Sequence, residues 1–291
     1  MTSPIGCHAL VFTGEFDPAG IETSVRRAAQ AGFDLIEFPL MDPFSFDSSA
    51  ARRALDAEGL QVSASLGLHA GADVSSDDPA VVDAGRQLLE AALDRTAEMG
   101  GSYLCGVLYG SMQKHMAPAT ATGRANSVAA IAGLAERAST LGIRLALEVV
   151  NRYESNLLNT GRQALQYIKE VEGTQVSVHL DTYHMNIEES DLFQPFLDTA
   201  DQLGYVHIGE SHRGYLGTGS VDFASAFRAL DRIHFDGPIV FESFSSTVVS
   251  ATLSNTLGIW RNLWNDGDDL AAHANRFIRD QIAAVKTIEM H

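Results

Sequence analysis

The segment VSVHLDTYHMNIEES, residues 176–190, joins an apolar run to a group of ionisable side chains. The run at its start is short and rich in β-branched residues, which predicts a buried strand. Two histidines and several acids then lie within a dozen residues, where a loop is expected to begin. Barrel enzymes carry catalytic groups at the C-terminal ends of their strands, so the other strand ends decide whether this segment belongs to a site.

Short apolar runs of the same kind alternate with longer amphipathic stretches along the chain. The stretches at residues 18–32, 79–101 and 126–143 have apolar residues at helical spacing. The first two begin at an Asp-Pro pair and end at glycine, which are helix start and stop signals. The glycine-rich residues 214–220 predict a turn before a helix that starts near Asp222. Eight apolar runs predict strands: Ile5–Phe12, Asp34–Leu40, Gln61–Leu68, Tyr103–Tyr109, Arg144–Val150, Val176–Thr182, Tyr205–Glu210 and Pro238–Ser243.

About eight strand-plus-helix units in one uninterrupted chain predict an α/β fold, a (β/α)8 TIM barrel in which residues 1–291 form a single domain. A doubly wound sheet is the alternative. No GxGxxG follows the first strand, and residues 214–220 lack the lysine of a P-loop, so this alternative is disfavoured. A last helix near Leu270–Ile288 predicts a C-terminal helical extension. Trp260 and Trp264 are four residues apart, so we expect them on one helical face, in the core or in a subunit contact.

Composition restricts the class of function. The net charge of −17 and the pI near 4.8 oppose binding to nucleic acid, whereas a neutral small molecule or a divalent cation is compatible with them. Cys7 and Cys105 lie in strand-like runs and predict buried, reduced thiols. The N-terminus has no basic region followed by a long apolar stretch, and no apolar run approaches the ~20 residues that span a membrane, so we expect a cytoplasmic protein.

The last four predicted strands each present a residue type that binds metals near the C-terminal end: Glu148, Asp181, His207 and Glu242. Each alone is compatible with a salt bridge or a satisfied core residue. Together, three carboxylates at one barrel rim would repel one another and be costly to bury unless a divalent cation lies between them. One imidazole and three carboxylates suit Mn²⁺, Co²⁺ or Mg²⁺ better than a structural zinc, and leave two octahedral positions for substrate oxygens or water.

The positions of Glu148 and Glu242 also predict a reaction. The fifth and eighth strands of a closed barrel lie on nearly opposite walls, so the two carboxylates face a substrate from two sides. A metal chelated by a ketone oxygen and the neighbouring hydroxyl would acidify the C–H between them and stabilise the enediolate. Proton removal on one face and delivery on the other inverts that carbon, whereas an aldose–ketose isomerase needs only one base.

The other ionisable residues of the segment 176–190 are assigned different roles according to their position. His179 has the same strand parity as Asp181, so we expect it inside the barrel, one layer below the metal ligand. His184 follows the strand and is expected to contact substrate or a metal ligand. Acids suit a helix N-terminus, so Glu188, Glu189 and Ser190 predict the start of the next helix.

Four segments resemble the ketose 3-epimerases of the D-tagatose and D-allulose (D-psicose) type, within the xylose isomerase-like TIM barrel superfamily. The resemblance implies that Glu148, Asp181, His207 and Glu242 bind one Mn²⁺, Co²⁺ or Mg²⁺ per subunit, and that the two glutamates are the acid/base pair. It also implies that Glu154, His184 and Arg213 contact the sugar, and that the protein is a homodimer or homotetramer. The segments are LEVVNRYE (147–154), HLDTYHMNIEE (179–189), VHIGESHRG (206–214) and VFES (240–243).

Departures from the family pattern leave the preferred sugar open. Family members often have several aromatic residues after the first strand, where this chain offers Phe12 and Phe16 with His8 close by, and Ser65 stands where some relatives have cysteine. The expected interconversions are D-fructose/D-allulose, D-tagatose/D-sorbose and L-ribulose/L-xylulose. The alternatives are an aldose–ketose isomerase or inosose dehydratase on the same barrel, an endonuclease-IV-like phosphodiesterase, and a non-enzymatic sugar-binding protein.

Overall fold

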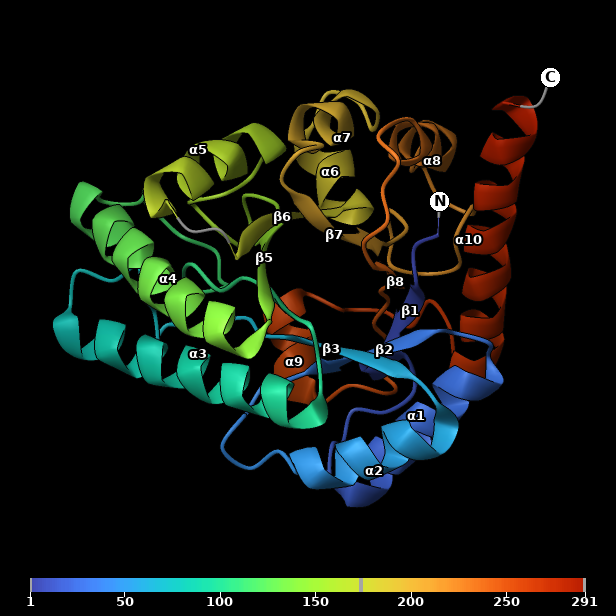
Figure 1. The fold of residues 1–291 in the computed structure, drawn as a ribbon, viewed down its shortest axis with the longest axis horizontal. Helices are drawn as coiled ribbons and strands as arrows, with labels where there is room; N and C mark the ends of the chain where they lie inside the picture. Colours follow the sequence, from blue (N-terminus) through green and yellow to red (C-terminus); the bar gives the residue numbers. More distant parts are fainter. Residues whose placement is uncertain (1, 173–174, 290–291) are drawn as a thin grey trace.

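Eight parallel strands close into a barrel in the computed structural model, which describes residues 2–172 and 175–289 (Figure 1). Strands that follow one another in the chain are neighbours in the barrel, and the first pairs with the last. The predicted TIM barrel is therefore confirmed and the doubly wound sheet is wrong. The strands are β1 (Ile5–His8), β2 (Leu35–Pro39), β3 (Gln61–Ser65), β4 (Tyr103–Gly106), β5 (Arg144–Val149), β6 (Val176–Asp181), β7 (Leu203–Ile208) and β8 (Ile239–Phe241).

Helices surround the barrel, and the three predicted from amphipathic stretches are all present. Asp17 and Asp78 cap two of them by accepting backbone hydrogen bonds, and Gly100 ends the second in a left-handed conformation, as the start and stop signals predict. The helices are α1 (Pro18–Gln30), α2 (Ser48–Glu58), α3 (Pro79–Met99), α4 (Ala121–Leu141), α5 (Gly161–Val171), α6 (Thr182–Glu188), α7 (Gln194–Thr199), α8 (Phe223–Arg232), α9 (Ala251–Leu257) and α10 (Gly267–Glu289), with a 3₁₀ turn at Ala9–Val11.

The observed strands end earlier than predicted, because buried apolar residues continue beyond the ladder. β1 stops at His8, whose Nδ1 accepts a hydrogen bond from the Leu10 backbone and begins the 3₁₀ turn. After β3 and β4, Leu66 and Val107 leave the strands but stay buried. Burial keeps these loop residues apolar, so hydrophobicity alone does not mark a strand end.

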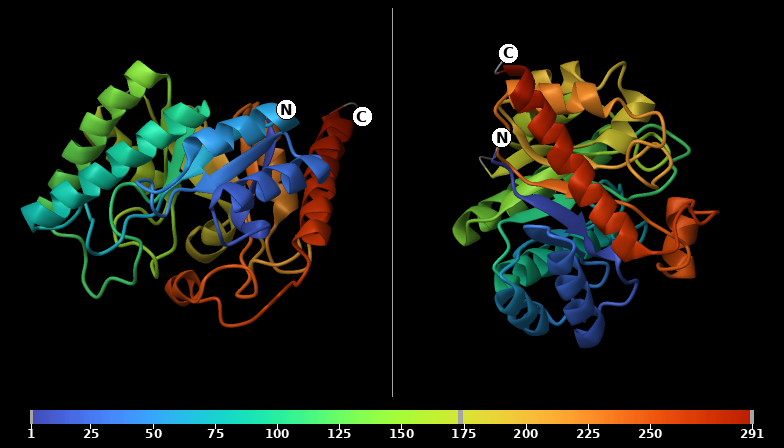
Figure 2. Two further views of the ribbon diagram at one scale, coloured as in Figure 1. Left: turned by 90° about the horizontal axis from the view of Figure 1, so that it is seen from below. Right: turned by 90° about the vertical axis from the view of Figure 1, so that its right-hand side faces the viewer.

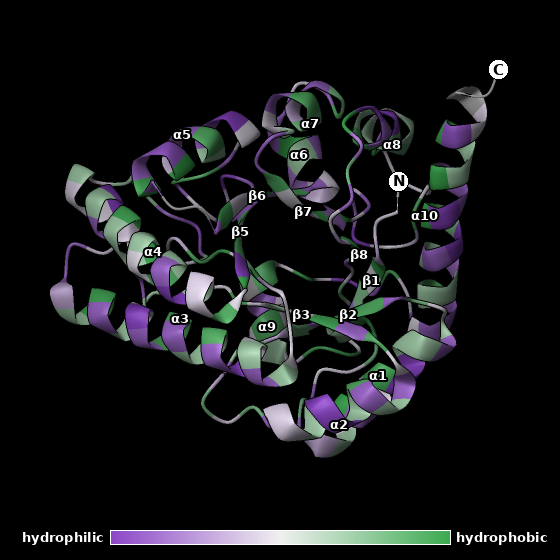
Figure 3. Ribbon diagram, in the orientation of Figure 1, coloured by the Kyte–Doolittle hydropathy of each residue, from purple (hydrophilic) through white to green (hydrophobic). Residues whose placement is uncertain are grey.

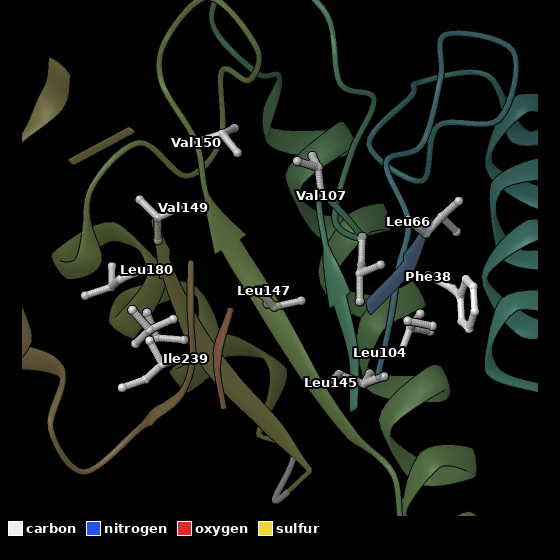
Figure 4. Close-up of a cluster of buried hydrophobic side chains, with 14 of the residues drawn as sticks. Phe38, Leu66, Leu104, Val107, Leu145, Leu147, Val149, Val150, Leu180 and Ile239 are labelled. Carbon is white, nitrogen blue, oxygen red and sulfur yellow. The ribbon is translucent and has the colours of Figure 1, made fainter. Parts of the chain in front are cut away.

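The strands separate two layers of side chains. On β5, Leu145, Leu147 and Val149 belong to the core between the barrel and the helices (Figure 4), whereas Ala146 and Glu148 have the opposite parity and face the interior. Figure 3 shows polar residues interspersed with apolar ones along α3 and α10, as expected for helices with one buried side. The base of the barrel interior contains Leu35, Cys105, Ala146, Tyr205 and Val240.

Two further predictions concern the cysteines and the last helix. Cys7 and Cys105 are buried, free thiols. The predicted last helix is α10, but it packs beside α8, β1 and β8, so it completes the ring of helices around the barrel instead of extending it (Figure 1). Within the described residues, none of the helices has the length and apolarity that a membrane span requires.

Helix α9 lies at the end of the barrel opposite the two chain termini (Figure 2). That end carries the C-terminal ends of the strands. Leu253 and Leu257 of α9 line a cavity there, together with residues from several strand ends. The C-terminal segment therefore covers part of the catalytic face of the barrel.

Two sequence expectations about helices are wrong. Glu188 ends α6 and Glu189 caps its C-terminus, instead of starting the next helix. The carboxylate of Glu188 pairs with Arg152, which explains the acid at this position. Trp260 and Trp264 follow α9 outside any helix, so they do not share a helical face.

The two tryptophans provide a matched stability test. Trp264 is 3% exposed and its Nε1 donates to Ser243 Oγ at 2.8 Å, whereas Trp260 is 76% exposed. Truncating a buried tryptophan costs about 3–5 kcal/mol, so we expect Trp264→Ala to lower the free energy of unfolding by that amount. Trp260→Ala should change it by no more than about 0.5 kcal/mol. Urea unfolding of both variants measures the difference, and equal losses would contradict these placements.

Candidate metal centre and substrate pocket

Four predicted metal ligands from separate strands meet at the C-terminal end of the barrel. Glu148 lies in β5, Asp181 ends β6, His207 lies in β7 and Glu242 directly follows β8. One ligand atom from each lies within 4.8 Å of all the others, and all four residues are buried. His207 Nδ1 is 3.8 Å from Glu148 Oε1 and 3.6 Å from Glu242 Oε2. The barrel therefore brings the four predicted ligands, each from the end of a different strand, into one cluster.

Two atoms of this cluster are suited to a cation. Among the described residues, Asp181 Oδ2 and His207 Nδ1 are buried and take part in no hydrogen bond. Buried polar atoms are normally hydrogen-bonded. An imidazole nitrogen without such a bond, among three carboxylates of which only two contact Arg213, indicates a ligand of positive charge. The residues present therefore fit a divalent metal ion.

Arg213 lies against the same carboxylates. Its Nη1 is 2.7 Å from Glu242 Oε2 and 3.0 Å from Asp181 Oδ2, and its guanidinium stacks over the Tyr183 ring with 4.0 Å to the centroid. With φ at +60°, its backbone is in the left-handed region, so the loop holds this residue in a strained conformation. Arg213 balances one of the three negative charges, and a divalent cation would neutralise the other two.

The two glutamates have different protonation tendencies. Burial raises the pKa of Glu148 above its ordinary value. Burial also acts on Glu242, but the positive charge of Arg213, followed by that of His207, holds the pKa of Glu242 well below its ordinary value. The asymmetry arises because Arg213 contacts Glu242 and makes no such contact with Glu148.

His184 lies at the edge of the cluster, as predicted. Its Nδ1 accepts hydrogen bonds from the Asn151 backbone N–H at 3.1 Å and from the Asn151 side chain at 2.8 Å. The proton is therefore on Nε2, which lies 3.6 Å from Glu148 Oε1 and 3.8 Å from Asp181 Oδ2. Asn151 Nδ2 also lies 2.9 Å from Glu154 Oε1. The sequence interpretation missed Asn151, although it lies only two residues after the end of the ligand strand β5.

Glu154 lines the cavity together with Arg213. Arg152, two residues earlier in the chain, forms an ion pair with Glu188 at 2.8 Å and none with Glu154. Burial raises the pKa of Glu154, and Arg213 opposes that rise. Glu154 therefore lines the same cavity as the cluster, and its contact with sugar stays a prediction.

A second layer of polar groups lies beneath the cluster. His179 is inside the barrel as predicted, with its ring 4.2 Å from that of His207. Glu37 of β2 was missed, because an acid within an apolar run has no neighbouring signal in the sequence. Its Oε2 accepts from Tyr205 at 2.6 Å and from His207 Nε2 at 2.9 Å. Burial favours a raised pKa for Glu37, but the charge and hydrogen bond of His207, together with His8, lower it to about 2.

The cavity has a polar side and an apolar side. His8 and Ser65 line it, but Phe12 and Phe16 are not among its lining residues. Phe12 packs under the Arg27 guanidinium and Phe16 packs against Phe38. The apolar side is formed mainly by Leu10, Pro39, Met41, Leu66, Val107, Met112, Val150, Phe244, Leu253 and Leu257.

Glu210 organises the loop that carries Arg213. The buried carboxylate accepts backbone hydrogen bonds from Ser211 at 2.8 Å, Gly217 at 2.9 Å and Val221 at 3.2 Å. Burial acts to raise its pKa, but these N–H donors outweigh burial and lower it. The ionised carboxylate therefore stabilises the folded loop.

We expect Glu210→Gln to reduce the melting temperature at pH 7. A lowered pKa in the folded state gives stability that is present above the unfolded-state pKa of about 4.3 and is lost as pH falls through the folded value. The difference in melting temperature between Glu210→Gln and wild type should therefore become smaller below about pH 4. Thermal melts of both proteins across this range measure it, and a constant difference would contradict the assigned hydrogen bonds.

Comparisons with known proteins agree with this geometry. The family model for the xylose isomerase-like TIM barrel matches residues 25–281. The chain is 64% identical to a ketose 3-epimerase from Arthrobacter globiformis, over 99% of both chains, and 52% identical to an L-ribulose 3-epimerase from Methylomonas sp., over 95% of this chain and 96% of the relative. It also resembles the crystal structure of a Methylomonas sp. D-allulose 3-epimerase in complex with D-allulose, with a TM-score of 0.94, 51% identity, and coverage of 96% and 97% of the two chains.

These matches confirm the sequence-based expectation of an isomerase of the epimerase class. The family model spans most of the barrel, and the curated relatives match over nearly their whole length. The chain belongs to the xylose isomerase-like TIM barrel family, among relatives that are ketose 3-epimerases.

Proposed function

We propose that this protein is a metal-dependent ketose 3-epimerase that inverts C3 of a free ketose. The observation that carries the proposal is the meeting of Glu148 and Glu242, from different walls of the barrel, at one cation-binding cluster with Asp181 and His207. The relatives that are ketose 3-epimerases support it over almost the full chain.

The two glutamates would act on opposite faces of the sugar. One carboxylate removes the C3 proton, which leaves an enediolate across C2 and C3. The other, in its acid form, delivers a proton to the opposite face of C3, and the roles exchange for the reverse reaction. A bound Mn²⁺, Co²⁺ or Mg²⁺ would supply the Lewis-acid stabilisation that such an anion requires. Between turnovers the two carboxyl groups return to their starting protonation by exchange with water.

Neighbouring side chains would hold the ketose in this position. His184 presents its Nε2–H beside two of the carboxylates, and Arg213 presents its guanidinium there. Both are donors for sugar oxygens, and Glu154 is an acceptor for a hydroxyl. Since Arg213 and a divalent cation balance the three carboxylates, a neutral sugar is favoured over a phosphorylated one.

The substrate pairs that we propose are D-fructose/D-allulose, D-tagatose/D-sorbose and L-ribulose/L-xylulose. The relatives named for L-ribulose and for D-allulose support ketopentoses and ketohexoses alike. Incubation with a panel of these ketoses, with each metal added back to chelated protein, and separation of the products tests the proposal. Formation of the C3 epimer is expected, whereas formation of an aldose would favour the aldose–ketose isomerase.

We further propose that the chain assembles as a homodimer or homotetramer. The proposal follows the family resemblance, and Met116 and Phe44, which are apolar and respectively 90% and 68% exposed on the single chain, are candidates for the contact. Sedimentation velocity tests the proposal. A monomer at micromolar concentration would contradict it.

A further inference from the structure

The buried carboxylate of Glu37 accepts hydrogen bonds from two side chains of β7. Tyr205 OH donates to Glu37 Oε2 at 2.6 Å, and His207 Nε2 lies 2.9 Å from the same oxygen. Ser63 Oγ lies 2.6 Å from Tyr205 OH and donates to it, because the single Tyr205 proton is directed to Glu37. Glu37 is fully buried, so this arrangement is shielded from water.

His8 lies on the other side of Glu37, near its second oxygen. Its Nδ1 accepts from the Leu10 backbone at 3.3 Å, so the His8 proton is on Nε2. That Nε2 is 3.3 Å from Ser65 Oγ and 3.5 Å from Glu37 Oε1. Glu37 Oε1 makes no hydrogen bond among the described residues, so the carboxylate is held through the two hydrogen bonds to Oε2.

The hydrogen bond to Glu37 determines which nitrogen of His207 can bind a metal. A carboxylate accepts hydrogen bonds but does not donate them, so His207 Nε2 must carry the proton at this contact. Metal binding would use the neutral imidazole, in which Nδ1 has a free lone pair when Nε2 carries the proton. This is the nitrogen that faces Glu148 and Glu242 and is without a hydrogen bond among the described residues.

We propose that Glu37 is a positioning residue for the metal site: it fixes the Nε2–H tautomer and the ring orientation of His207 and increases the basicity of His207 Nδ1. Metal-binding histidines commonly donate their second nitrogen to a carboxylate, and loss of that partner typically weakens metal binding 10- to 100-fold. Glu37 does not reach the substrate cavity, so its effect passes through His207. The inference rests on the proposed metal-dependent function.

The Glu37→Gln variant tests the role with little change in volume. We expect its dissociation constant for Mn²⁺, measured by electron paramagnetic resonance on chelated protein, to rise 10- to 100-fold above that of wild type. At saturating Mn²⁺ the Michaelis constant for the ketose should change less than the metal affinity, because Glu37 contacts no sugar. A Mn²⁺ affinity within twofold of wild type, in a folded variant, would overturn the proposal.

Asp73→Asn is the matched control for loss of a buried carboxylate. Asp73 accepts hydrogen bonds from Ser75 and from Ser111, and it contacts none of the proposed metal ligands. This variant should melt at a lower temperature but bind Mn²⁺ like wild type. An equal loss of Mn²⁺ affinity in Asp73→Asn would mean that the effect at Glu37 is only structural, and would overturn the proposal.

A second variant covers the case in which Glu37→Gln does not fold. Glu37→Asp keeps the negative charge, but its side chain is one methylene shorter and its carboxylate lies farther from His207. We therefore expect weaker Mn²⁺ binding in this variant too. Unchanged binding would overturn the proposal. Failure of the proposed function gives a different result. If the proposed function is wrong, wild type itself binds no Mn²⁺ and epimerises no ketose. If only the Glu37 inference is wrong, wild type and the Glu37 variants both bind Mn²⁺ and epimerise the ketose.

Discussion

Glu148→Gln and Glu242→Gln should each reduce the epimerisation rate by a factor on the order of 10²–10⁴ or more. Each change removes a general acid/base, for which such losses are typical, and also weakens one ligand of the cation. The four cluster residues come from separate strands of an otherwise intact barrel, so the fold should survive. Rates measured at saturating Mn²⁺ for both directions of one ketose pair test this expectation.

The two variants also distinguish the roles of the glutamates. With only one base left, the protein should still exchange the C3 hydrogen of the epimer whose C–H faces that base, without inverting it. Glu148→Gln and Glu242→Gln should therefore exchange opposite epimers in D₂O. Near-normal turnover in either variant would remove that residue from the acid/base pair.

Removal of the metal should abolish activity, and Mn²⁺, Co²⁺ or Mg²⁺ should restore it. Without a cation, the three carboxylates of the cluster keep a charge that Arg213 balances only in part. Binding to the folded state alone stabilises it by about 2.7 kcal/mol when the free metal is at 100 times its dissociation constant. The melting temperature of chelated protein should therefore rise when metal is added.

Asp181→Asn and Asp73→Asn form the control pair for this measurement. Both residues are buried aspartates, but only Asp181 has an oxygen that faces the cluster centre. Metal should raise the melting temperature of Asp73→Asn and have much less effect on Asp181→Asn. Full activity in the presence of excess chelator would contradict the metal-dependent account.

The sequence predicts the barrel and the four-residue cluster because both depend on local patterns. A short apolar run in the sequence predicts each strand. A closed parallel barrel then places the C-terminal ends of all strands at one rim. Glu148, Asp181, His207 and Glu242 share the interior strand parity, so a single rule places all four together. No long-range information is needed beyond the fold class.

Other parts of the site depend on contacts that no local pattern encodes. Glu37 and Asn151 are single polar residues, and their roles arise from distant partners, His207 and His184. The apolar side of the cavity includes Leu253 from α9, which reaches the barrel rim only through the path of the C-terminal segment. That path is set by tertiary packing, which a sequence pattern does not specify.

The aromatic residues illustrate the same limit. Phe12 ends the first strand as the sequence predicts it, where family members often have aromatic residues. The observed strand ends at His8, and after the 3₁₀ turn Phe12 packs under the Arg27 guanidinium. The acids at the end of α6 were misread for a similar reason. Glu188 forms an ion pair with Arg152 of a neighbouring loop. The preference of acids for helix N-termini does not predict that contact.

Incorporation of solvent deuterium tests the two-base account most directly. Wild-type protein with Mn²⁺, incubated with one ketose in D₂O, should yield the C3 epimer with one deuterium at C3 and none at C1 or C4, as read by NMR. Deuterium at C1 with an aldose product would indicate an aldose–ketose isomerase. Epimer that retains its original hydrogen at C3 would contradict proton removal by one glutamate and delivery by the other.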